Sequence, residues 1–243
     1  MIKNLLKKLI WFNQKALGID QLISIEKEIL SAQRFNSTIL GSEWFKYQSI
    51  SPGNMAVDYG FFLTLYRTLT SFKPRNILEF GLGQSSKMVH QYACYYGTNA
   101  LTVEHDETWA DFFKKEKDGD YPVNIKIMDL DYVEFKGKQV EVYKDCLETF
   151  RGQKFDMIIV DGPSSSFDHY SRIQILDLVK ECLAEDFVIM VDDLNLKGEQ
   201  NTSKEILRTL DDLKIKKAYK VYKSYKKHIL ITNEINRFLT TLW

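Results

Sequence analysis

The chain has 243 residues, 44% of them hydrophobic and 27% charged, with only 12 glycines and 4 prolines. This composition is typical of a globular protein and excludes collagen and low-complexity disorder. Basic and acidic residues number 33 each, so no bulk positive field is present to hold nucleic acid. The three cysteines (Cys94, Cys146 and Cys182) form no metal-binding spacing and predict reduced thiols in a cytoplasmic protein.

The first 54 residues are predicted to form a helical extension ahead of one domain at residues 55–243. Ile2, Leu5 and Leu9 recur at helical spacing, and four lysines occur before the first acidic residue, Asp20. The pattern fits a helix packed on the domain or on a partner subunit of a homo-oligomer. It also fits a basic amphipathic helix at residues 1–18 that makes peripheral contact with the inner face of a membrane.

A break at residues 51–54 precedes a predicted helix at 55–72, which ends before Pro74. From residue 76 onward, short apolar runs alternate with helical stretches, the pattern of a parallel sheet covered on both faces. The predicted strands are 76–80, 100–103, 123–128, 155–160 and 187–191. The predicted helices between and after them are 84–96, 107–117, 168–184 and 201–213.

Two further strands, at 218–225 and 228–232, are close enough in sequence to form an antiparallel hairpin at the sheet edge. Between the third and fourth strands, residues 134–138 predict a turn. The predicted fold is therefore α/β, with a doubly wound, mostly parallel seven-stranded, Rossmann-like sheet and an N-terminal helical extension.

A glycine-containing loop follows the first predicted strand. Gly81 and Gly83 allow a sharp turn and a close approach of a ligand to the backbone. The next helix begins near Gln84 and Ser85, so its free N–H groups face the same crevice. The third glycine of a dinucleotide fingerprint is replaced by Ser86, so the loop does not complete the GxGxxG motif.

Two acidic residues accompany this loop. Glu79 precedes it, and Glu104 follows the second predicted strand, 25 residues after Glu79, near the spacing at which a carboxylate accepts hydrogen bonds from ribose hydroxyls. With the loop LEFGLGQSS, the segment TVEHD and the strands IIVDGP and VIMVDD, the chain resembles class I S-adenosylmethionine-dependent methyltransferases over residues 55–233. The residues of the glycine loop and of the segment VEHD further resemble those of methyltransferase-like proteins of bacterial surface-polysaccharide synthesis.

The resemblance implies an S-adenosylmethionine site. Glu79 would lie near the amino-acid part of the cofactor, directly or through the loop, with Gly81, Gly83, Gln84 and Ser85 against it. Glu104 would hold the ribose, with His105 beside it as a local hydrogen-bonding group. Asp129, after the third strand, would lie near the adenine amino group, and Trp109 would either pack on the adenine or fill the core.

A second group of acids follows the fourth and fifth predicted strands. Asp161, Asp192 and Asp193 are expected to meet at one end of the sheet, where three close carboxylates repel unless a cation or protonation relieves them. Such oxygen ligands suit Mg²⁺ or another divalent cation. The arrangement resembles metal-dependent O-methyltransferases, in which the metal holds the acceptor hydroxyl. It predicts both a metal site and a catalytic role for Asp161.

The lysine that those enzymes place after the fourth-strand acid is absent here. His169 is the predicted general base in its place, since imidazole accepts a proton near pH 7, with Asp168 as an alternative. The structural interpretation is that Asp168 caps the following helix and that His169 lies in its first turn.

The leading functional prediction is methyl transfer from S-adenosylmethionine to a hydroxyl of a sugar or glycan precursor. One alternative is an NAD-linked reductase or epimerase, for which Tyr222 and Lys226 have the required spacing. Another is a nucleic-acid or membrane-surface binder that uses the seven lysines of residues 214–228. The balanced net charge argues against nucleic acid as a partner.

Overall fold

The computed structural model describes Lys7, Trp11, Lys15 and residues 18–53, 55–163 and 169–241. Its centre is a seven-stranded sheet in the order β3-β2-β1-β6-β7-β9-β8. Six of these strands run the same way, and β9 runs antiparallel to both of its neighbours. The strands are β1 (Asn76–Phe80), β2 (Asn99–Glu104), β3 (Ile125–Ile127), β6 (Phe155–Val160), β7 (Leu183–Val191), β8 (Lys217–Lys223) and β9 (Lys227–Asn233).

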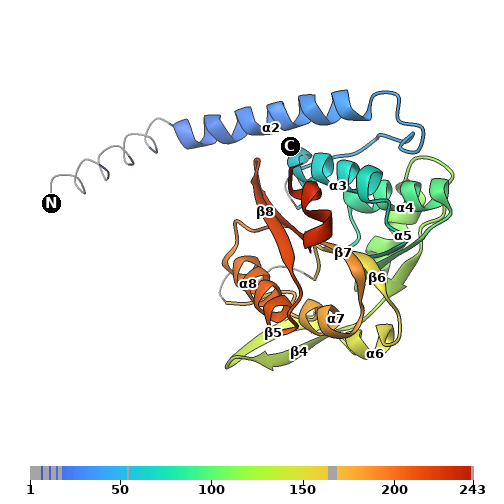
Figure 1. Ribbon diagram of the computed structural model, residues 1–243. Coiled ribbons are helices and arrows are strands. Elements are labelled where there is room, and N and C mark those ends of the chain that lie inside the picture. Colours follow the sequence, from blue (N-terminus) through green and yellow to red (C-terminus); the bar gives the residue numbers. More distant parts are fainter. Residues whose placement is uncertain are drawn as a thin grey trace.

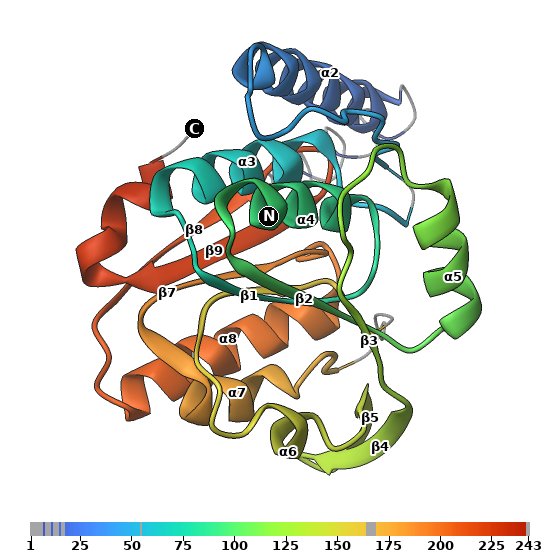
Figure 2. The ribbon, with the colours of Figure 1, turned by 90° about the vertical axis from the view of Figure 1, so that its right-hand side faces the viewer.

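The strands form a sheet because their side chains are apolar on both faces. In β1, Ile77 belongs to one buried cluster, and its neighbours Leu78 and Phe80 belong to the cluster on the opposite face. Helices cover each face, as Figure 2 shows. On one side lie α3 (Tyr59–Phe72) and α4 (Gln84–Tyr96), and on the other α6 (Cys146–Phe150), α7 (Ile175–Glu181) and α8 (Lys197–Asp212). The doubly wound, mostly parallel fold predicted from the sequence is confirmed.

The chain reverses direction across the sheet at β1. From β1 it moves outward to β2 and β3, and it then returns to place β6 on the other side of β1. In open α/β sheets, ligands bind beyond the carboxyl ends of the strands at this kind of switch point. At the same end, α5 (Glu107–Glu116) packs Ala110 and Phe113 against Leu82 of the glycine loop.

The extension helix α2 (Ile19–Ile39) lies on the outer side of α3 (Figure 1). Its last turns are buried through Phe35 and Ile39, which share a hydrophobic cluster with Trp44, Phe45 and the helix α3. Within the part of the chain that the structure describes, no helix is both long and apolar enough to cross a bilayer.

The predicted helix at 168–184 is wrong in its extent. Residues 169–174 are not helical, α7 covers only Ile175–Glu181, and β7 begins at Leu183, four residues before the strand predicted at 187. Arg172 explains the late start, because its backbone is left-handed (φ 57°) and its guanidinium donates to the carbonyls of Pro163 and Val160. These contacts hold the segment against the end of β6 instead of in a helical turn.

The segment between β3 and β6 also contains more structure than predicted. The turn expected at 134–138 joins two strands, β4 (Leu130–Phe135) and β5 (Lys138–Tyr143), which pair antiparallel as a separate hairpin. Most of β4 is exposed, so its sequence lacks the apolar run by which the other strands were found. The last described element is η1 (Glu234–Thr241), which packs beside α3 and β8.

Candidate functional site

The glycine loop between β1 and α4 is anchored from beneath by Glu79. This carboxylate is fully buried and accepts hydrogen bonds from the hydroxyls of Ser85 at 2.7 Å and Thr102 at 2.7 Å. The Thr102 hydroxyl is in turn 2.9 Å from Nε2 of His90. Burial raises the pKa of Glu79 and lowers that of His90 to about 4. Glu79 therefore holds the start of α4 through Ser85, and its predicted role near the cofactor stays a prediction.

The two glycines of the loop have different surroundings. Gly81 has φ +93°, and a Cβ added there would lie 2.4 Å from the carbonyl oxygen of Asp161. The loop after β1 and the end of β6 can touch only because this position carries no side chain. A Cβ on Gly83 would meet nothing within 4 Å, so the backbone there faces open space.

Glu104 closes the other side of the loop. Its Oε2 accepts from the Leu82 backbone N–H at 3.0 Å. Its Oε1 accepts from the backbone N–H groups of His105 and Asp106, and it lies 2.8 Å from Nδ1 of His105. A carboxylate offers about four acceptor positions, so Oε2 keeps one for a further donor. Trp109 donates from Nε1 to the Leu82 carbonyl at 2.8 Å, which is a contact with the loop itself.

A pocket of about 130 Å³ lies at this end of the sheet. The loop glycines, Glu104 and His105 line one side of it, and Asp161 lies at the end of β6 on the other. Gln84 and Ser85 contribute the start of α4, and Met55, Ala56 and Val57 of the segment before α3 form part of the rim. The structure thus brings seven of the eight predicted cofactor residues into or directly beneath one pocket.

Asp129 is the exception among them. It is exposed, it is absent from the lining of this pocket, and its recorded hydrogen bond is made by its carbonyl, which accepts from the Lys144 N–H at 2.8 Å. The hairpin β4–β5 is inserted directly after this residue, and the end of β5 contributes Tyr143 to the lining of the pocket.

The three predicted acids do meet at the ends of β6 and β7. One carboxylate oxygen each of Asp161, Asp192 and Asp193 lies within 4.8 Å of the others. Asp192 is fully buried, and in the described part of the chain no hydrogen-bond donor reaches either of its oxygens. Glu199 of α8 is buried nearby, and its two carboxylate oxygens likewise accept no hydrogen bond from the described residues. We name Asp161, Asp192, Asp193 and Glu199 the acid cluster.

Two cations that the sequence did not single out as members of this site lie within the acid cluster. Nη2 of Arg172 is 3.4 Å from Asp161 and 3.1 Å from Asp193, and its Nε is 3.7 Å from Glu199. Nζ of Lys226, from the β8–β9 turn, is 3.2 Å from Asp193 and 4.0 Å from Asp192. Neither residue has a sequence signal that could have placed it here, since each comes from a separate segment of the chain.

Charge in the acid cluster is only partly balanced. When all are ionised, four carboxylates face two cations, which leaves two uncompensated negative charges. Burial, opposed by Arg172 and reinforced by Asp193, raises the pKa of Asp161 to about 7. Burial and the neighbouring acids raise the pKa of Asp192 well above its ordinary value. The buried carboxylate oxygens, which have only long ion pairs to Arg172 and Lys226, and the excess negative charge both fit a divalent cation.

The hairpin turn that carries Lys226 is fixed from α3. Asp58 is fully buried, caps α3 by accepting from the Phe61 N–H, and also accepts from the Ser224 hydroxyl and the Lys226 backbone N–H. Tyr222, the partner of Lys226 in the reductase-like spacing, instead donates its hydroxyl to the Leu239 carbonyl in the core. The hydroxyl and the amine therefore belong to different environments.

His169 is the first described residue after Pro163. Asp168 is outside the described residues. His169 is exposed, and its carbonyl accepts from Nδ2 of Asn201 at 2.7 Å. It is not in the first turn of a helix, because α7 begins at Ile175. Its role as a general base stays a prediction.

No protein-family model and no curated protein matches this chain. Among solved structures, it is similar to a Podospora anserina methyltransferase bound to SAH, with 15% identity over 87% of this chain and 88% of that one and a TM-score of 0.46. Human methyltransferase-like protein 13 in complex with SAH gives 17% identity over 74% and 85% of the chains and a TM-score of 0.49.

A probable spermidine synthase from Corynebacterium glutamicum is also similar, with 14% identity over 71% of this chain and 63% of that one and a TM-score of 0.46. The strand order of the sheet, with one antiparallel strand next to its edge, is that of the class I methyltransferase fold. This fold is therefore present here.

Proposed function

We propose that the chain is an S-adenosylmethionine-dependent methyltransferase that modifies a hydroxyl of a sugar or glycan precursor. The observation that carries the proposal is that the pocket under the glycine loop and the acid cluster share one residue. Asp161 lines the pocket under the glycine loop and also belongs to the acid cluster. A cofactor in the pocket and an acceptor at the acid cluster would therefore be neighbours.

S-adenosylmethionine would supply an activated methyl group on a sulfonium cation. The chain's own contribution is to position it. The open space above Gly83 and the N–H groups at the start of α4 would admit its amino-acid part. The remaining acceptor position on Oε2 of Glu104 would take a ribose hydroxyl.

The acid cluster would bind the acceptor side. Asp161, Asp192 and Asp193 would hold a divalent cation, which lowers the pKa of a bound hydroxyl and fixes its orientation. Arg172 and Lys226 keep the carboxylates together and limit the excess charge to what one such ion balances. His169, on the loop beyond Asp161, remains the proposed base.

Release of S-adenosylhomocysteine from S-adenosylmethionine in the presence of a panel of free and nucleotide-linked sugars tests this function. We expect turnover with at least one sugar, suppression by a chelator and recovery with Mg²⁺. Full turnover in excess chelator would overturn the metal site and leave the acids as direct ligands of the acceptor. Turnover on none of the sugars, combined with normal cofactor binding, would overturn the acceptor class alone.

A further inference from the structure

The N-terminal half of α2 has an apolar surface that the fold does not use. From Ile19 to Leu30 no residue is buried, although Glu28 accepts a hydrogen bond from the backbone N–H of Tyr59 at the start of α3. Figure 1 shows the first turns of α2 extending past the body of the domain. Large apolar side chains are nonetheless concentrated in it, namely Leu22, Ile23, Ile25, Ile29 and Leu30, each between 41% and 63% exposed. We name these five residues the α2 face.

The arrangement of the α2 face is broader than a coiled-coil seam. Leu22, Ile25 and Ile29 follow the three- and four-residue spacing of one helical stripe. Ile23 and Leu30 stand one position after Leu22 and Ile29, which widens the stripe beyond the two positions per heptad of a paired helix. Phe35 and Ile39, which do pack on α3, lie on the other side of the helix.

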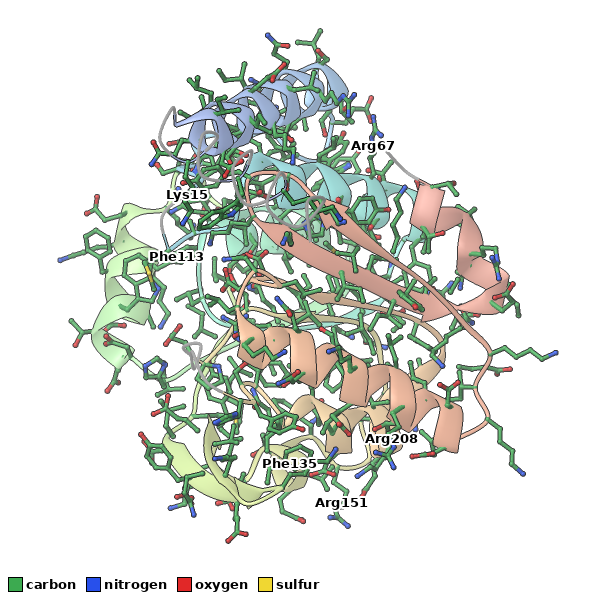
Figure 3. The ribbon with its side chains drawn as sticks, turned by 90° about the vertical axis from the view of Figure 1, so that its left-hand side faces the viewer. Lys15, Arg67, Phe113, Phe135, Arg151 and Arg208 are labelled. Carbon is green, nitrogen blue, oxygen red and sulfur yellow. The ribbon has the colours of Figure 1, made fainter. Side chains whose placement is uncertain are left out.

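The charges of the segment before α2 have one sign, and the first acid of the chain is Asp20 in the first turn of the helix. Lys7 and Lys15 are exposed, and Nζ of Lys15 lies 4.9 Å from the ring centre of Trp11, itself 55% exposed. Figure 3, in which the left-hand side of Figure 1 faces the viewer, labels Lys15. The first 19 residues contain four lysines and no acid, although the whole chain is neutral. Lysines with an exposed tryptophan ahead of a wide apolar face match a surface of anionic lipid, whereas two copies of such a segment would repel each other.

We infer that the α2 face docks the chain on an anionic lipid bilayer, with Leu22, Ile25 and Ile29 entering the interface and with Lys7 and Lys15 contacting the headgroups. Burial of these apolar side chains supplies attraction that does not depend on salt, and the lysines supply attraction that does. Glu26 lies on the same side of the helix, four residues after Leu22, and its negative charge opposes binding of the α2 face to anionic lipid.

Flotation of the full chain with phosphatidylglycerol–phosphatidylcholine vesicles, against phosphatidylcholine alone, tests the inference. We expect binding to the anionic vesicles that weakens as salt is raised. The triple variant Leu22→Gln, Ile25→Gln, Ile29→Gln should lose about tenfold or more of that binding, and the folded domain should be unaffected because all three side chains are exposed. Glu26→Lys should strengthen it on anionic vesicles only.

The matched control is Ile235→Gln with Phe238→Gln, which removes apolar side chains that are 82% and 48% exposed elsewhere on the surface. This variant should bind vesicles as the unmodified chain does. Equal loss in the control and in the triple variant would overturn the inference. So would a triple variant that binds normally, or a lipid-free dimer by light scattering that the triple substitution abolishes, since the α2 face would then join two copies.

Discussion

Substituting the two loop glycines separates the packing of the glycine loop from its ligand contacts. In Gly81→Ala the new methyl carbon would lie 2.4 Å from the Asp161 carbonyl oxygen, at a φ of +93°. The left-handed backbone costs about 1–2 kcal/mol for a residue with a side chain, and overpacking against rigid backbone costs about 1–3 kcal/mol. Together, roughly 2–5 kcal/mol would lower the melting temperature by about 4–20 °C in a chain of this size.

Gly83→Ala is the matched control within the same loop. Its methyl group meets nothing within 4 Å and its φ of −159° is ordinary extended backbone, so the melting temperature should hardly change. The methyl group would instead occupy space in the pocket, and affinity for S-adenosylhomocysteine should fall by about ten- to a hundredfold. Differential scanning fluorimetry and isothermal titration measure the two effects. A Gly81→Ala variant as stable as the unmodified chain, or a Gly83→Ala variant with unchanged affinity, would refute the reasoning.

Three further predictions concern single side chains. Glu104→Ala should reduce the affinity for S-adenosylhomocysteine by about ten- to a hundredfold in calorimetry, because one charged hydrogen bond is lost, and unchanged affinity would reject the ribose role. His169→Ala should lower turnover by about 10²–10⁴ with cofactor affinity unchanged, whereas His105→Ala should weaken cofactor binding modestly; normal turnover in the first variant would place the base elsewhere. His90 has a pKa near 4 when folded and 6.5 when unfolded, so its neutral form stabilises the fold above pH 6.5, and up to about 3 kcal/mol is lost as the pH falls toward 4. The melting temperature of His90→Asn should therefore fall less over this range than that of the unmodified chain, and equal slopes would contradict the burial of a neutral imidazole.

The sheet could be predicted because its signal is local. Each buried strand is a short apolar run, and Gly81 and Gly83 mark the turn that follows the first one. The meeting of Asp161 with Asp192 also follows from topology alone, since parallel neighbouring strands end at the same edge. These inferences needed no knowledge of side-chain packing.

The rest of the site depends on contacts between distant segments. Lys226 reaches Asp193 across 33 residues because Asp58 fixes the hairpin turn, and no local pattern encodes that contact. Arg172 takes part through a left-handed backbone inside what reads as a helix. The lysine that the resemblance led us to expect shortly after Asp161 is absent. The acid cluster is instead paired with Lys226 of the β8–β9 turn and with Arg172 of the segment before α7. The sequence alone could not place either segment next to the acids.

The central claim is that the pocket under the glycine loop binds S-adenosylmethionine beside a cation-binding acid cluster. Isothermal titration of S-adenosylmethionine into the full chain, with Mg²⁺ and then with a chelator, tests it most directly. We predict saturable binding to one site per chain in both conditions, weakened by Gly83→Ala, together with a separate Mg²⁺-binding signal that Asp192→Asn removes. Absence of saturable cofactor binding, or binding that Gly83→Ala leaves unchanged, would contradict the account.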